Sequence, residues 1–122
     1  MMGLPTGVRI WLVAGVTDMR KGMTGLCALV QTALGDSPFS GQLFIFRGRR
    51  ADQVKIIWHE TDGLCLYCRR LDRGRFIWPQ AADGKVLLSG AQLSMLLEGI
   101  DWRRPERTAA REIDPIGPTL NV

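Results

Sequence analysis

Strand-forming apolar residues, with polar and charged residues between them, are concentrated in several short stretches of this chain, as they are in β-strands. These stretches cover about residues 8–13, 42–47, 53–59, 64–71 and 75–78. The turns between the later stretches are only a few residues long, and such short connections favour antiparallel neighbours because parallel strands need long crossovers. The pattern therefore predicts a mostly antiparallel sheet of four or five strands, arranged as a meander.

A helical period replaces the strand period between Asp18 and about Leu34. Asp18 is a good N-cap residue, and apolar side chains recur behind it at helical spacing, at Met19, Met23, Leu26, Val30 and Leu34. A Gly-Asp-Ser-Pro run at residues 35–38 ends the segment. The sequence predicts one long helix that packs on the sheet and buries Phe44 and Phe46, which share one face of a strand.

A second, shorter helix is predicted over residues 90–98. Ser89 and Gln92 have the spacing of a capping box, Leu88 and Leu93 that of a hydrophobic staple, and Gly99 suits a left-handed C-terminal cap. With the long helix and the sheet, this element completes an α+β fold.

Residues 1–102 are expected to form a single domain, and 103–122 a flexible C-terminal tail rich in Arg, Pro and small polar residues. Trp102, at the start of that tail, is a candidate for a protein interface. No stretch approaches the roughly 20 apolar residues that span a bilayer, so no membrane partner is expected. Three cysteines fit a reducing cytoplasm better than a disulfide framework.

Charge adds a candidate function to this fold. The chain carries a net charge of +4, and residues 43–79 hold eight basic side chains against four acidic ones. Seven of the eight are arginines, whose planar guanidinium matches phosphate oxygens and base edges. The predicted DNA-contacting residues are Arg47, Arg49, Arg50, Lys55, Arg69, Arg70, Arg73 and Arg75. The alternative is an ordinary solvated surface, partly neutralised by Asp52, Glu60, Asp62 and Asp72.

Arg20 and Lys21 form a second candidate, a phosphate site. They are predicted to lie in the first turn of the long helix, where cations oppose the helix dipole but free amides attract anions. The alternative is that one of them pairs with an acid elsewhere in the fold.

Other chemistry has weaker support. Cys65 and Cys68 have zinc-knuckle spacing, but residues three apart on a strand point to opposite faces, so no metal site is predicted. His59, Glu60 and Asp62 are the best acid–base group, yet the acids lie in turns, where such residues also serve local hydrogen bonding. We therefore expect no catalytic residues, no cofactor and no enzymatic activity. A metal-dependent nuclease is the least favoured alternative.

Two stretches resemble a known family. They are FxFRGRRxDxxKI followed by DGLCLYCRRLDRGRFxWP within residues 43–79, and Asp-Met-Arg-Lys-Gly at 18–22. Over about residues 8–102 the chain resembles the accessory protein encoded by the second reading frame of insertion sequence 66 elements of bacteria. The resemblance implies a role in DNA transposition, together with a separate transposase and other element-encoded proteins. It also implies a cytoplasmic protein that associates with the nucleoid when it binds DNA. A protein-only adaptor that docks the transposase is the alternative.

Overall fold

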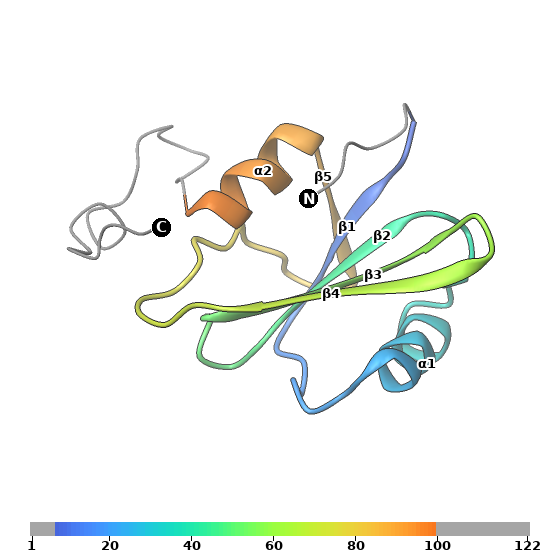
Figure 1. The fold of residues 1–122 in the computed structure, drawn as a ribbon, viewed down its shortest axis with the longest axis horizontal. Helices are drawn as coiled ribbons and strands as arrows, with labels where there is room; N and C mark the ends of the chain where they lie inside the picture. Colours follow the sequence, from blue (N-terminus) through green and yellow to red (C-terminus); the bar gives the residue numbers. More distant parts are fainter. Residues whose placement is uncertain (1–6, 100–122) are drawn as a thin grey trace.

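The computed structural model describes residues 7–99. Along the chain it contains β1 (Ile10–Val13), α1 (Met23–Ala33), β2 (Leu43–Arg47), β3 (Gln53–Glu60), β4 (Gly63–Arg70), β5 (Lys85–Leu88) and α2 (Gly90–Glu98) (Figure 1). The predicted α+β class is thus confirmed. The predicted tail at 103–122, the domain limit at 102 and the proposed interface at Trp102 lie outside the described residues. None of the helices within residues 7–99 is long and apolar enough to cross a membrane.

The five strands form one mixed sheet in the order β4-β3-β2-β1-β5. The predicted meander is confirmed for β2, β3 and β4, which pair antiparallel across short turns. β1 and β2, however, are parallel, with Ile10 opposite Leu43. The chain between them contains α1 and is long enough for the crossover that parallel neighbours require. The antiparallel pairing predicted from short turns is therefore found between β2, β3 and β4, which short turns connect, but not between β1 and β2.

The two helices cover opposite faces of the sheet, with α2 above and α1 below in Figure 1. On the α1 face, Leu26 and Val30 pack with Phe44 and Phe46, as predicted for these rings. On the α2 face, the helix leucines pack with inward side chains from β1, β2, β3 and β5, among them Leu12, Ile45, Ile56 and Leu88. Successive residues of a strand thus pack alternately into two separate cores. A shift of one residue would exchange the two faces, so this packing fixes the register of the central strands.

The predicted start of the long helix at Asp18 is wrong, because α1 begins at Met23 and has 11 residues. Its N-cap is Gly22, in an extended conformation. The Asp18 carboxylate instead accepts a hydrogen bond from the Arg20 backbone, 3.0 Å away, in a local turn of the kind that Asp favours.

The predicted strand at residues 75–78 is also wrong. This stretch is rich in strand-forming apolar residues, but it lies in a coil that folds over the α2 face, where Phe76 is buried. The Phe76 amide donates to the Ala51 carbonyl at 2.9 Å, and the Trp78 indole donates to the same carbonyl at 3.0 Å. The fifth strand is β5, which the sequence analysis missed, and it pairs antiparallel with β1.

The second helix agrees with its prediction at both ends. Ser89 accepts from the Gln92 amide at 3.0 Å and the Gln92 side chain accepts from the Ser89 amide at 2.8 Å, which completes the capping box. Gly99 has φ 75° and closes the C-terminus in the left-handed region. Both leucines of the predicted staple, Leu88 and Leu93, lie in the α2-face core.

We expect Ser89→Ala to lower the free energy of unfolding by about 1 kcal/mol, because the first turn of α2 loses its side-chain acceptor. Urea denaturation measures this loss. Ser94→Ala, an exposed change inside the same helix, is the matched control and should be neutral or slightly stabilising. Equal losses in the two variants would contradict a specific capping role for Ser89.

Candidate functional site

Three chain segments meet at one end of the sheet. The turn between β2 and β3 is joined to the segment after β4 by a bond from the Leu71 amide to the Asp52 carbonyl at 2.8 Å. The segment before α1 reaches the same end, where the Thr17 amide donates to the Arg47 carbonyl at 2.8 Å. The two arginine-rich turns therefore lie at the same end of the sheet, and residues 16–20 lie beside them.

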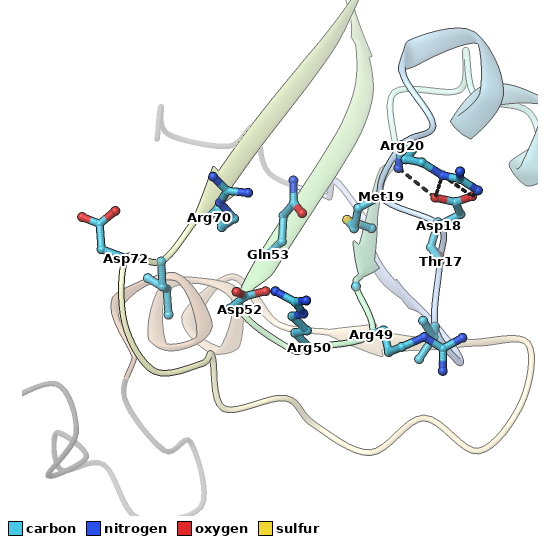
Figure 2. Close-up of a pocket in the computed structure, with 13 residues that line it drawn as sticks. Thr17, Asp18, Met19, Arg20, Arg49, Arg50, Asp52, Gln53, Arg70 and Asp72 are labelled. Carbon is cyan, nitrogen blue, oxygen red and sulfur yellow. Dashed lines mark hydrogen bonds and ion pairs between the residues drawn. The ribbon is translucent and has the colours of Figure 1, made fainter.

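Between these segments lies an open hollow of about 1030 Å³. Four arginines and three aspartates supply its charged lining (Figure 2). The full lining is Val16, Thr17, Asp18, Met19, Arg20, Gly48, Arg49, Arg50, Asp52, Gln53, Arg70, Leu71 and Asp72. We call this site the hollow.

Close packing at Gly48 shapes the hollow. A Cβ atom on Gly48 would lie 2.7 Å from Cγ of Met19, so only glycine lets the 16–20 segment approach the β2–β3 turn this closely. The turn itself is tight, with the Ala51 amide donating to the Gly48 carbonyl at 3.1 Å and Ala51 at φ 64°. This geometry places Arg49 and Arg50 on an exposed turn beside the 16–20 segment.

Lys55 holds the segment before α1 against the sheet. Its side chain is only 9% exposed on the α1 face of β3, and Nζ donates to the carbonyl oxygens of Met19 and Lys21, each at 2.8 Å. The Lys55 ammonium thus makes hydrogen bonds within the protein. The structure places this predicted DNA-contacting residue beneath the hollow's wall rather than in its lining.

Arg47 and Arg69 point to the α2 face. Register places Arg47 opposite Val54 and Val54 opposite Arg69, and Val54 belongs to the α2-face core. Arg69 donates to the Leu97 carbonyl at 2.9 Å. Its positive charge there also interacts favourably with the dipole at the C-terminal end of α2. The Arg47 guanidinium lies 5.8 Å from the centre of the Trp78 ring. Both side chains make packing contacts away from the hollow.

The remaining predicted arginines divide between two places. Arg49, Arg50 and Arg70 line the hollow and are exposed. Arg73 and Arg75 are exposed on the coil after β4 but do not line the hollow. The structure thus brings together three of the eight predicted side chains, and it adds Arg20 from the second candidate group.

Arg20 and Lys21 lie before the N-cap of α1, so their predicted place in its first turn is wrong. The exposed Arg20 side chain is paired with Asp18, at 2.7 Å between the guanidinium and a carboxylate oxygen (Figure 2). Hydrogen bonds from the Arg20 side chain and backbone hold the pKa of the Asp18 carboxyl well below its usual range. Asp18 is consequently ionised at neutral pH and neutralises Arg20 at the edge of the hollow.

The weaker candidates take ordinary structural positions. Cys65 packs against the α2-face core, while the exposed Cys68 lies opposite Lys55 on the other face, as strand geometry predicted. The His59 ring packs edge-on against Phe39, and Glu60 accepts from the Trp58 indole at 3.0 Å. Within residues 7–99, no three His, Cys, Asp or Glu side chains are grouped to hold a metal ion.

Sequence reasoning missed two parts of the hollow. It treated Asp52 and Asp72 as surface charges that offset the arginines, whereas both line the same hollow. It also placed residues 18–20 on a helix, and therefore missed that they form one wall. No local pattern marks this wall, because Thr17 and Lys55 fix it through bonds to residues about 30 or more positions away.

Comparisons with known proteins match one family model and two uncharacterized relatives. The family described as "IS66 Orf2 like protein" matches residues 8–107. The uncharacterized protein y4hO of Sinorhizobium fredii is 51% identical over 107 residues, which cover 86% of this chain and 93% of that protein. The uncharacterized protein y4jC of the same organism is 38% identical over 107 residues, covering 88% and 92%. No solved structure matches.

Proposed function

The chain belongs to the IS66 Orf2-like family and is thus an insertion-sequence-associated protein, and from this premise we propose that it is a non-catalytic accessory protein of DNA transposition. In this proposal it acts in the bacterial cytoplasm beside a separate transposase. It contacts DNA through the arginines of the hollow and joins the nucleoid when it is bound.

The observation that carries the proposal is the convergence of Arg20, Arg49, Arg50 and Arg70 from three chain segments around one hollow. Guanidinium groups donate two parallel hydrogen bonds to phosphate and so bind a nucleic acid backbone with defined geometry. Arg49, Arg50 and Arg70 are exposed, so a DNA backbone can reach them without rearrangement of the sheet. Lys55, Arg47 and Arg69 are left out of the proposed contact surface because their side chains serve internal contacts.

The aspartates of the hollow weaken the attraction between its arginines and phosphate. Asp18, Asp52 and Asp72 bring three negative charges to the four arginines. A phosphate backbone must therefore engage the arginines from the open side, at a distance from these carboxylates. We expect binding of moderate strength with a modest salt dependence, since few phosphates are neutralised.

Asp18→Asn is expected to tighten duplex binding about eightfold at 0.1 M salt, because it releases Arg20 for one further phosphate contact. The salt slope should steepen by about 0.9 for the same reason. Fluorescence anisotropy with labelled duplex measures both quantities. The double variant Asp18→Asn/Arg20→Gln is the control, and its affinity should return to that of the wild type. A gain that persists in the double variant would contradict the release of Arg20 as its cause.

A nuclease role is not part of the proposal. Two-metal DNA cleavage uses carboxylates that converge on the ions, whereas the Asp18 carboxylate is already engaged by Arg20. Incubation of purified protein with plasmid and magnesium tests this point. Nicking that Asp52→Ala or Asp72→Ala abolishes would make the protein an enzyme.

A protein-only adaptor is the second candidate function. The three carboxylates of the hollow favour it, because they repel phosphate but suit a partner surface that carries both charges. In that case the hollow docks the transposase or another element-encoded protein.

The deciding experiment is an anisotropy titration of the full chain with labelled duplex and single-stranded DNA over a salt series. The proposal expects a log–log salt slope of about −3 for duplex, from the three exposed arginines that carry no ion pair with Asp18. No binding at low salt would reject DNA contact and favour the adaptor. Binding with no salt dependence would also reject the arginine site.

A further inference from the structure

The outer strand β4 presents a long, open edge. Within residues 7–99 it pairs with β3 alone, along eight residues from Gly63 to Arg70. The opposite edge of the sheet is β5, which has only four residues. A short edge strand is itself a protection against pairing with other chains, whereas a long one leaves a row of backbone donors and acceptors available. The two edges therefore differ in their capacity to accept another strand.

The middle of β4 lacks the usual protection. Residues 64–67 are Leu, Cys, Leu and Tyr, all half-buried, with no proline and no charge among them. Cys65 and Tyr67 pack against the α2-face core, and Leu66 packs against the α1-face core. A strand added here would consequently extend both cores, because apolar side chains lie on both faces of the edge.

Charge is distributed unequally along this edge. Exposed Glu60 and Asp62 lie at the turn that begins β4, and exposed Arg70 lies at its end, next to Arg69. An antiparallel neighbour of the same sequence places the acidic end of each strand against the basic end of the other. A parallel neighbour places like charges together, which is unfavourable for facing residues.

We propose that a second copy of this chain pairs with β4 in antiparallel orientation about a two-fold axis at Leu66. Leu66 of each copy then faces its counterpart, and Arg70 of each copy faces Asp62 of the other. This is an isologous contact in which the same patch serves both copies, as in most dimers. It joins the two five-stranded sheets into one continuous sheet. The inference does not rest on DNA binding, although Arg70 belongs to both proposed contact surfaces.

Charge reversal tests the pairing by sedimentation velocity over a concentration series. The wild type should show a concentration-dependent dimer. Arg70→Asp and Asp62→Arg should each weaken self-association about tenfold or more, since each makes two facing pairs repulsive. The double variant Arg70→Asp/Asp62→Arg should recover the dimer. An equimolar mixture of the two single variants should form the heterodimer, because each facing pair then carries opposite charges.

A cysteine at the axis gives a second readout. Leu66→Cys in a Cys65→Ser/Cys68→Ser background should form an intermolecular disulfide on mild oxidation, because facing Cβ atoms lie about 5 Å apart. Burial raises the pKa of the remaining Cys27 thiol, which keeps it slow to react. The parent without the Leu66 change is the control, and circular dichroism checks that each variant is folded.

Three results would overturn the inference. The first is a wild type that is monomeric at every concentration, and the second is a dimer that neither charge reversal weakens. The third is a folded Leu66→Cys variant that crosslinks no more than its parent. The dimer is read from mass alone, so these results do not bear on DNA contact by the hollow. A lack of DNA binding would likewise leave the β4 pairing intact.

Discussion

Replacing Arg49, Arg50 and Arg70 together with glutamine is expected to lower duplex DNA affinity about 500-fold at 0.1 M salt. Each phosphate contact contributes about −0.9 to the log–log salt slope, which corresponds to about eightfold in affinity at that concentration. The three side chains are exposed in the hollow and belong to neither core within residues 7–99, so the variant should fold as the wild type does. Anisotropy over a salt series should show a slope shallower by about 3.

Two comparisons sharpen this prediction. Arg9→Gln removes the same charge from an exposed residue just before β1, at the opposite end of the sheet from the hollow, and should change affinity only slightly. The pair Arg49→Gln/Arg50→Gln should lose about 60-fold, which separates the hollow from any effect of Arg70 on self-association. If Arg9→Gln weakened binding as much as Arg50→Gln, overall charge rather than the hollow would be the cause.

Lys55→Met is expected to lower the free energy of unfolding by about 3 kcal/mol. The variant keeps a long apolar side chain but removes the ammonium that bonds the carbonyls of Met19 and Lys21. Each carbonyl loses a charge-assisted donor, and the loss of such bonds at a buried site is costly. Guanidinium denaturation followed by tryptophan fluorescence measures the change.

Lys21→Met is the matched control for Lys55, because the structure uses the Lys21 carbonyl and not its ammonium in this contact. Its effect on stability should stay within about 0.5 kcal/mol. Lys55→Met should also weaken DNA binding, since the 16–20 wall of the hollow loses its anchor to β3. Unchanged stability in Lys55→Met would show that the wall is held by its other contacts, such as the Thr17 amide bond to Arg47.

The candidate site could be predicted only in part, and strand geometry explains why. Arg69 and Arg70 are neighbours in the sequence, so charge clustering grouped them together. On β4 they point to opposite faces, and only Arg70 reaches the hollow while Arg69 binds the end of α2. Period-two alternation, applied to the arginines as it was to the apolar residues, would have separated them. DNA contact by these side chains remains a prediction.

Lys55 could not have been separated in this way. A lysine on a strand between apolar neighbours is typical of an exposed position. Its partners are two backbone carbonyls 36 and 34 residues away. Every residue has a backbone carbonyl, so no sequence pattern predicts which carbonyl will be the partner of Lys55.

The sequence by itself determined the elements whose causes are local. The meander of β2, β3 and β4 follows from strand-forming apolar stretches and short turns, and α2 follows from its capping box and Gly99, because these signals act within a few residues. Tertiary structure alone decided the parallel pairing of β1 with β2, the addition of β5, and the coil at 75–78. It also decided the assembly of the hollow. Each of these depends on hydrogen bonds and packing between segments far apart in the chain, where competing local preferences are overridden.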